Sequence, residues 1–280
     1  MTLKLRPLHD LFGAEVEGIA WQEPPSPDVA EALRDAFREV RLLCLRADPM
    51  TPETFRAFAR CFGTPKVQVG DHLEDVPEVT VLDSTYARPE DKPADMALVR
   101  LTGWHTDDSY LSRPAKATLL QALAIPQSGG QTRFADTHAA YDDLPGDEAA
   151  YLGRLRAVHR YDCSRARVRA TGLTQEQADA LGEASHPLVR RHDDTGRPAL
   201  YFNSNRTERV EGMERPESDA LLDRLHAHMI EARYQYHHDW RVGDILVWDN
   251  RCLIHSVNMD FPVGQMRRHQ RILLDGPVPH

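Results

Sequence analysis

The sequence lacks the cysteine pattern of a disulfide-bonded or zinc-ribbon protein. Its 280 residues contain four cysteines, and no two of them form a CxxC pair: they are Cys44, Cys61, Cys163 and Cys252. Small secreted domains are dense in disulfides, and structural zinc sites pair their cysteines at short spacing, so neither class fits. Isolated cysteines are typical of thiols kept reduced in a cytoplasm, which is the location that we expect.

Long apolar stretches and an excess of positive charge are also missing. No window approaches the roughly 18 apolar residues of a membrane-spanning helix, and the first residues do not show the basic and then apolar pattern of a secretory signal. The 43 acidic residues outnumber the 34 basic ones, which gives a formal net charge of −9. This acidic balance argues against nucleic acid or a membrane as the partner, and a homo-oligomer stays open.

What the sequence does contain is a series of short apolar strands with a few helices between them. No internal repeat or long linker divides it, so we expect a single domain over residues 1–280. Such a pattern is typical of a barrel or sandwich, and the predicted fold class is mainly β with flanking helices (α+β). Strands are expected at 14–19, 78–83, 117–125, 234–240, 244–248, 253–257 and 267–274, a hairpin over 187–202, helices from 27, from 52 to Gly63, and at 147–158, 174–181 and 217–233, and a long loop at 84–100.

A histidine and an aspartate lie two positions apart in the segment Gly103-Trp104-His105-Thr106-Asp107. On a strand, residues i and i+2 point to the same face, so His105 and Asp107 can reach one point in space. An imidazole and a carboxylate that converge are two of the three ligands of a facial triad, which suits Fe(II). His255, after a strand and a tight turn, is the best candidate for the third ligand. Taken alone, however, an HxD pair is more often structural than metal-binding.

Two further segments fit the same chemistry. In a strand over 267–274, the side chains of Arg267, His269 and Arg271 share one face. A buried arginine there would bind an anion, and its planar fork matches a carboxylate. The hydroxyl of Thr132 would be a second donor to that anion. The ordinary alternatives are a solvated basic strand or a small nucleic-acid patch for the arginines, and a plain hairpin around Thr132.

Taken together, these segments resemble the taurine / 2,4-dichlorophenoxyacetate dioxygenase family of Fe(II)- and 2-oxoglutarate-dependent oxygenases. The matching elements occur in the order of the family, span most of the chain and are specific in combination. They are Trp104-His105-Thr106-Asp107, Gly129-Gly130-Gln131-Thr132-Arg133-Phe134-Ala135-Asp136 with Ala139-Ala140-Tyr141-Asp142, Arg241-Val242-Gly243-Asp244, Trp248-Asp249-Asn250-Arg251 with His255, and the closing Arg267 and Arg271.

The resemblance implies a double-stranded β-helix (jelly-roll, cupin-like) core. It implies His105, Asp107 and His255 as ligands of Fe(II), with 2-oxoglutarate and O2 as co-substrates. In the implied reaction, 2-oxoglutarate is converted to succinate and CO2 while a C–H bond of a small organic substrate is hydroxylated. Halogenases of this chemistry lose the carboxylate ligand, so the presence of Asp107 argues against halogenation.

The resemblance also assigns the residues that bind 2-oxoglutarate. The far carboxylate is expected at Arg271 and Thr132, whereas Arg267 is expected nearer the metal, at the near carboxylate or an anionic group of the substrate. The distance from His255 to the arginines is one residue longer than in taurine dioxygenase, which makes Arg268 a weaker alternative.

The substrate is expected to be a small anion. The taurine-specific branch carries a polar amide four residues before the first metal histidine, and Leu101 occupies that position here. The chain looks closer to the aryloxyalkanoate-cleaving branch, in which hydroxylation beside an ether oxygen yields a phenol and a 2-oxo acid. Alkyl sulfates, sulfonates and amino-acid derivatives are the alternatives. Further candidate pocket residues are His72, Tyr110, Arg165 and Arg167, each of which could instead be an ordinary surface residue.

Two other kinds of function use the same residues. A zinc-dependent hydrolase or a cupin-type isomerase would hold its metal with the same two histidines and aspartate, but Thr132 and Arg271 would have no evident role. A non-catalytic binding module on the same barrel would not need every catalytic ligand. The oxygenase accounts for more of the sequence than either alternative does.

Overall fold

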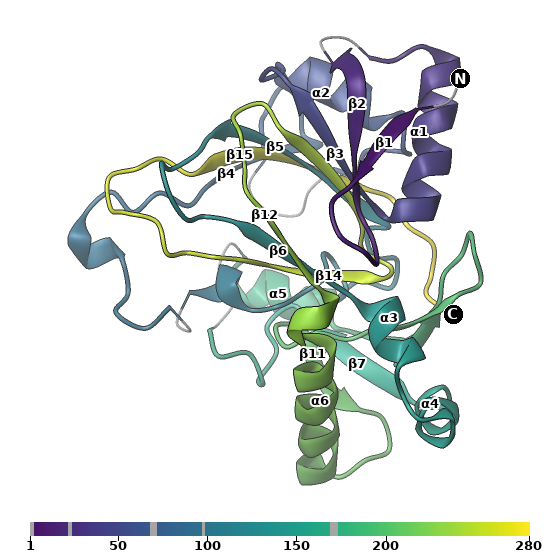
Figure 1. Cartoon of the computed structure of the whole chain (residues 1–280). Coiled ribbons are helices and arrows are strands. Elements are labelled where there is room, and N and C mark those ends of the chain that lie inside the picture. Colours follow the sequence, from purple (N-terminus) through teal and green to yellow (C-terminus); the bar gives the residue numbers. More distant parts are fainter. Residues whose placement is uncertain (1–2, 22–23, 68–71, 97–98, 169–172) are drawn as a thin grey trace.

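The computed structural model describes residues 3–21, 24–67, 72–96, 99–168 and 173–280 (Figure 1). In chain order the strands are β1 (Lys4–Pro7), β2 (Ala14–Trp21), β3 (Leu42–Ala47), β4 (Val79–Asp83), β5 (Ala117–Ala124), β6 (Thr132–Asp136), β7 (Arg156–Arg160), β8 (Glu183–Pro187), β9 (Val189–Arg191), β10 (Pro198–Leu200), β11 (Thr207–Val210), β12 (Gln235–His238), β13 (Ile245–Asp249), β14 (Leu253–Val257) and β15 (Arg268–Leu274). The helices are α1 (Pro27–Val40), α2 (Pro52–Ala59), α3 (Thr137–Asp142), α4 (Gly146–Leu152), α5 (Gln175–Leu181) and α6 (Arg215–Met229), with 3-10 turns at Pro89–Asp91, Arg100–Thr102 and Ala232–Tyr234.

Two sheets face each other across the middle of the molecule (Figure 1). The larger sheet has the strand order β1-β2-β3-β13-β5-β15-β4, and the smaller one has the order β12-β6-β14. Neighbouring strands in both sheets are antiparallel, except that β2 and β3 are parallel. The small sheets β11-β7-β8 and β10-β9 complete the described strands. The predicted strand-dominated architecture with flanking helices is thus confirmed.

The alternation of side chains along the strands divides the core into layers. In β13, Ile245 and Val247 belong to the apolar cluster that contains residues of α1 and α2. Leu246 and Trp248 of the same strand belong instead to a cluster that contains Phe134 of the smaller sheet. Successive residues of a strand point to opposite faces, so one strand supplies both layers. The larger sheet is therefore packed on both sides, with helices outside and the smaller sheet inside.

The first two helices form where the sequence predicts them. α1 begins with proline in its first turn and buries Ala30, Leu33 and Phe37 at helical spacing. The hydroxyl of Thr51 caps α2 by accepting a hydrogen bond from the backbone nitrogen of Thr54 at 3.3 Å. None of the helices in the described ranges is long and apolar enough to cross a bilayer.

One predicted helix is wrong in its second half. The helix expected at 147–158 ends at Leu152, and Arg156–Arg160 is strand β7. β7 lies between β8 and β11, and its residues Ala157 and Val158 are buried there. Pairing with two strands distant in the sequence outweighs local helix preference, which is worth only a few tenths of a kcal/mol per residue. Strand β3 was not predicted either, because it follows directly on α1.

The turn before β13 requires a glycine. Gly243 has φ of +91°, and a Cβ atom at this position would lie 1.9 Å from the backbone oxygen of Ala47. The next residue, Asp244, accepts a hydrogen bond from the backbone nitrogen of Arg241 at 2.8 Å and pairs with Arg46. The turn therefore joins β13 closely to the end of β3.

Replacement of Phe58 by alanine should destabilise the fold by about 3–5 kcal/mol. The ring is fully buried, with its centroid 5.9 Å from that of Trp21 and 6.0 Å from that of Phe62. Urea unfolding followed by circular dichroism measures the change. The matched control is Tyr151→Ala, which removes a ring that is 40% exposed and should change stability by less than about 0.5 kcal/mol. Equal unfolding midpoints for the two variants would contradict the packing described here.

Candidate active site

His105, Asp107 and His255 converge between the two sheets. One nitrogen of each histidine and one carboxylate oxygen lie within 4.8 Å of one another. Nε2 of His255 is 3.8 Å from Oδ2 of Asp107, and the centroids of the two imidazole rings are 4.2 Å apart. Asp107 and His255 are buried and His105 is partly buried. The structure thus brings together the three residues that the sequence analysis singled out as a metal-binding set.

The backbone achieves this convergence in a different way from the one expected. His105 is not part of a regular strand but forms an isolated antiparallel bridge with His255 of β14. The two backbone hydrogen bonds of this bridge are 2.9 and 2.7 Å long. Asp107 follows in a turn, and Asp108 has a positive φ of 55°. Thr106 points away, as expected, and donates to the backbone oxygen of Asn250 at 2.8 Å.

Hydrogen bonds fix the orientation of the donor atoms. Nδ1 of His105 lies 2.9 Å from the backbone oxygen of Gly103. Because a carbonyl oxygen can only accept, Nδ1 carries the hydrogen and the lone pair of His105 is at Nε2. Thr118 in β5 donates to Oδ2 of Asp107 at 2.6 Å. The ring of His255 packs against that of Trp248, with centroids 4.8 Å apart.

The local charges set protonation states suited to a cation. Burial raises the pKa of Asp107, but the neighbouring His255, Arg271 and His105, together with the hydrogen bond from Thr118, outweigh burial and lower this pKa to about 2. Burial also lowers the pKa of His255 to about 3. At neutral pH the carboxylate is therefore charged and the imidazole is neutral, which are the forms that bind metal ions.

A cavity of about 270 Å³ opens beside this set, and His105 and His255 form part of its wall. Strands of both sheets form its walls, since Leu120 and His269 come from the larger sheet and Thr132 and Val257 from the smaller one. Arg267 and Arg271 also line it. The cavity therefore lies in the space between the sheets that apolar side chains fill elsewhere.

One part of the cavity wall is built to receive an anion. Arg267 donates from Nη2 to the hydroxyl oxygen of Thr132 at 3.3 Å, from Nε to the backbone oxygen of Gly130 at 3.0 Å, and from Nη1 to Ser84 at 3.2 Å. The indole nitrogen of Trp240 also donates to Thr132, at 3.0 Å. A hydroxyl that accepts two hydrogen bonds keeps its own hydrogen to donate, and two of the five N–H groups of Arg267 are not used in these bonds.

The charge of Arg267 also indicates that this part of the cavity wall binds an anion. Burial lowers its pKa to about 10, and within the described ranges no carboxylate pairs with it. A buried cation is costly unless an anion compensates its charge. Arg267 and Thr132 together therefore present a positive charge and a hydroxyl donor to the cavity.

The order of the two arginines is the reverse of the one expected. Nη1 of Arg271 lies 3.6 Å from Oδ1 of Asp107, so Arg271 is the arginine beside the metal-binding set. The expected pairing of Thr132 with Arg271, and the expected position of Arg267 nearer the metal, are wrong for this structure. Four residues span about 13 Å along a strand, and alternation shows that both side chains share a face without showing which end lies at the metal. Arg268, the weaker alternative, is exposed and does not line the cavity.

Only some of the residues predicted to contact the substrate line the cavity. Leu101 lines the cavity, as expected. His72 is exposed and is not part of the cavity wall. Tyr110 is buried instead against Tyr161, with ring centroids 5.2 Å apart, and donates to Asp108 at 3.1 Å. His72 and Tyr110 therefore do not contribute to the cavity wall in this structure.

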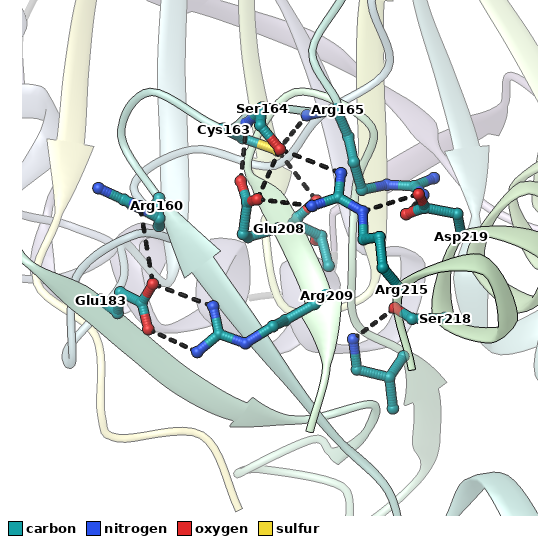
Figure 2. A network of polar contacts seen from close by, with 12 residues as sticks. Arg160, Cys163, Ser164, Arg165, Glu183, Glu208, Arg209, Arg215, Ser218 and Asp219 are labelled. Carbon is teal, nitrogen blue, oxygen red and sulfur yellow. Dashed lines mark hydrogen bonds and ion pairs between the residues drawn. The ribbon is translucent and has the colours of Figure 1, made fainter. Parts of the chain in front are cut away.

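Arg165 and Arg167 line a different cavity, of about 300 Å³. Segment 101–105 contributes to the walls of both cavities. Figure 2 shows Arg165 directed toward Asp219, to which it is paired, and it also pairs with Asp223 at 2.6 Å. Two carboxylates already balance the charge of Arg165. Its role is therefore structural, since it joins its own segment to α6.

Sequence reasoning missed several polar groups of the site, among them Thr118 and Trp240. Thr118 orients Asp107, and Trp240 orients Thr132. Neither lies in a segment with a metal-ligand or anion-binding pattern, and no signal in the sequence connects them to their partners. Their positions follow from the pairing of strands that are distant along the chain.

Loss of one donor should weaken metal binding sharply. Removing groups that only orient a ligand costs 10- to 100-fold in affinity, so His105→Ala or His255→Ala should cost more than about 100-fold, and Thr118→Val about 10-fold or more. Anaerobic titration calorimetry with Fe(II) or Mn(II) measures these losses. His237→Ala, at an exposed histidine, is the control. Unchanged affinity in the alanine variants at positions 105 and 255 would place the metal elsewhere.

Comparisons with known proteins agree with this site. The family model "Taurine catabolism dioxygenase TauD, TfdA family" matches residues 4–273. The alpha-ketoglutarate-dependent 2,4-dichlorophenoxyacetate dioxygenase of Burkholderia sp. (strain RASC) is 31% identical over 264 residues, which cover 91% of this chain and 89% of the relative. The (S)-phenoxypropionate/alpha-ketoglutarate-dioxygenase of Sphingobium herbicidovorans is 32% identical over 283 residues, covering 97% and 95%.

A solved structure shows the same similarity in three dimensions. AAD-2 in complex with Mn(II) and N-oxalylglycine matches with a TM-score of 0.83 at 29% identity, covering 100% of this chain and 99% of that one. The alpha-ketoglutarate-dependent dioxygenases of this family use Fe(II), 2-oxoglutarate and O2, the cofactor and co-substrates that the resemblance implied. The chain belongs to the TauD, TfdA family of dioxygenases and is an oxidoreductase of that class.

Proposed function

We propose that the protein is an Fe(II)- and 2-oxoglutarate-dependent dioxygenase that hydroxylates a C–H bond of a small organic anion and releases succinate and CO2. One observation carries this proposal: a single cavity is lined both by the two histidines of the metal-binding set and by Arg267 and Thr132, which supply a cation and a hydroxyl. A 2-oxo dicarboxylic acid has two ends that suit these two groups, a chelating end for a metal and a carboxylate for the arginine.

His105, Asp107 and His255 would hold the iron. Two imidazoles and one carboxylate leave about three positions of an octahedron open, which gives room for a bidentate 2-oxo acid and for O2. The residues fit an Fe(II) ion because Nε2 of His105 is left as the coordinating nitrogen and Asp107 is ionised. The bound iron supplies the activation of O2, and the protein supplies position and the exclusion of water.

Arg267 and Thr132 would bind the far carboxylate of 2-oxoglutarate. The guanidinium offers a fork of N–H groups, and the hydroxyl hydrogen of Thr132 is held ready because its oxygen already accepts two bonds. Gly130 and Ser84 fix the guanidinium in place before the ligand arrives. Such preorganisation lowers the entropy cost of binding.

Arg271 and Leu101 are the residues that we propose for the substrate. Arg271 lies at the metal end of the cavity and its side chain is 24% exposed, so an anionic group entering from solvent can reach it. Leu101 provides an apolar wall in the same cavity. A carboxylate next to an apolar ring, as in an aryloxyalkanoate, matches this pair. The similarity to relatives named for 2,4-dichlorophenoxyacetate and phenoxypropionate supports that class.

Ether cleavage follows from hydroxylation at the right carbon. If the carbon between the ether oxygen and the carboxylate is hydroxylated, the product is a hemiacetal-type adduct that collapses to a phenol and a 2-oxo acid. The protein therefore needs to position this carbon near the iron, and no separate hydrolytic group is required. Alkyl sulfates, sulfonates and amino-acid derivatives are the alternative substrates.

The facing sheets are, in this proposal, the two halves of a double-stranded β-helix, and residues 1–280 form one domain. The cavity between the sheets and the match of the family model over residues 4–273 support both statements. A cytoplasmic location and the absence of nucleic-acid and membrane partners stay predictions from the composition, and a homo-oligomer stays open.

The reaction class can be tested before the substrate is known. Fe(II) added anaerobically with 2-oxoglutarate should give a weak visible charge-transfer band, because a bidentate 2-oxo acid binds the metal. A panel of aryloxyalkanoates, alkyl sulfates, sulfonates and N-substituted amino acids, scored by succinate release, then identifies the substrate. A zinc hydrolase would give no band and no succinate. Absence of the band, or absence of succinate across the whole panel, from iron-loaded protein would contradict the proposal.

Arg267→Ala should raise the dissociation constant of 2-oxoglutarate by about 100-fold, because it removes one partner of a buried charge pair. Metal affinity should stay nearly unchanged. The matched control is Arg268→Ala, which removes an exposed arginine of the same strand region. Anaerobic calorimetry on the metal-loaded protein measures both constants. A larger loss in Arg271→Ala than in Arg267→Ala would restore the assignment that the sequence alone suggested.

A further inference from the structure

One buried histidine in the cavity wall has no assigned role. His269, the second residue of β15, is fully buried and lines the same cavity as Arg267 and Thr132. Neither of its ring nitrogens has a hydrogen-bond partner among the described residues. Buried polar side chains nearly always have at least one partner, so two unsatisfied nitrogens on a residue that lines a cavity point to a bound group.

The neighbours of His269 place it beside the anion-binding pair. Its ring packs edge-on against Trp240, with centroids 4.6 Å apart and an interplanar angle of 68°. Trp240 donates its indole hydrogen to the hydroxyl of Thr132 at 3.0 Å. Arg267 precedes His269 by two residues and lines the same cavity. The imidazole therefore borders the place where we put the far carboxylate of 2-oxoglutarate.

The imidazole is neutral in these surroundings. Burial lowers the pKa of His269 well below its usual value, and the nearby charges of Arg267 and of His238, when protonated, lower it further. A neutral imidazole carries one N–H donor and one lone pair. Next to a carboxylate held by an arginine, the favourable arrangement directs the N–H at the carboxylate. An apolar residue of similar size would pack against Trp240 equally well, so packing alone does not require histidine.

We propose that His269 donates a third hydrogen bond to the far carboxylate of the bound 2-oxo acid, beside those of Arg267 and Thr132. This inference rests on the proposed function, which places 2-oxoglutarate in the cavity. Its consequence is selectivity, because a buried site with three converging donors is left unsatisfied by a 2-oxo acid that has no second carboxylate. His269 acts by contact with the co-substrate and takes no part in the chemical step.

The test compares two ligands and two variants. 2-Oxoglutarate and 2-oxovalerate share the chelating end, but 2-oxovalerate lacks the far carboxylate. His269→Leu keeps similar bulk and removes the donor, whereas His269→Gln keeps an N–H donor. Dissociation constants are measured by anaerobic calorimetry on the Mn(II)-loaded protein, with 2-oxovalerate measured by competition at high concentration. Metal affinity and thermal unfolding of each variant are recorded as well.

His269→Leu should weaken 2-oxoglutarate by about 10- to 100-fold, the usual effect of a lost hydrogen bond to a charged group. It should change the binding of 2-oxovalerate by less than about two-fold and leave metal affinity unchanged, and His269→Gln should recover part of the loss. An equal loss for both 2-oxo acids would show that His269 only shapes the cavity. Unchanged affinity for 2-oxoglutarate would show that its nitrogens face water. Either result overturns the inference.

The same experiment separates this inference from the function on which it rests. If the metal-loaded parent protein does not bind 2-oxoglutarate, the proposed function itself fails. If the parent binds it and Arg267→Ala weakens it, but His269→Leu does not, the proposed function stands and the role of His269 is wrong.

Discussion

Two backbone hydrogen bonds between His105 and His255 determine the geometry of the whole site. They join segments that are far apart in the chain and hold the two imidazoles next to each other, with their ring planes tilted by 44°. The bridge is isolated, because strand pairing does not continue past it on the side of His105. The chain can therefore turn at once and bring the carboxylate of Asp107 back to the same point. A longer ladder would have kept this segment extended and directed it along the sheet.

The site also depends on the packing between the two sheets. Thr132 and His255 belong to the smaller sheet, whereas Thr118, His269 and Arg271 belong to the larger one. The same interior holds buried rings, and Phe134 lies 5.3 Å from Trp248 and 6.3 Å from His255 between ring centroids. The cavity is thus a part of the core left open and lined with polar groups. Core packing and ligand binding cannot be varied independently here.

Much of this arrangement could be predicted from the sequence, and the exceptions have a common cause. The metal set could be found because His105 and Asp107 are close in the sequence and His255 follows a recognisable segment. Thr132, Arg267 and Arg271 could be chosen for the same reason. Which arginine meets Thr132 could not be predicted, because it depends on how β15 is placed relative to β6 and β14. The same limit explains strand β7, whose partners lie elsewhere in the chain.

The predicted substrate residues show a related limit. Arg165 and Arg167 were candidates because they lie in a loop that flanks the matched motifs. Arg165 nevertheless pairs with carboxylates of α6 that no local pattern connects to it. A charge in a loop says little about its partner until the fold is known. Of the predicted pocket residues, Leu101 lines the cavity, whereas Tyr110, which is at least as near a metal ligand in the sequence, is buried elsewhere.

The tight turn at Gly243 has a consequence for how related sequences are judged. The segment Arg241-Val242-Gly243-Asp244 contributed to the family resemblance, but its glycine is required by the backbone of Ala47 and its aspartate is bound by Arg46 and by the turn itself. Selection for correct folding alone would preserve this stretch. A related protein that had lost its iron ligands would still carry this stretch. The stretch therefore indicates common ancestry and does not show whether a homologue is still catalytically active.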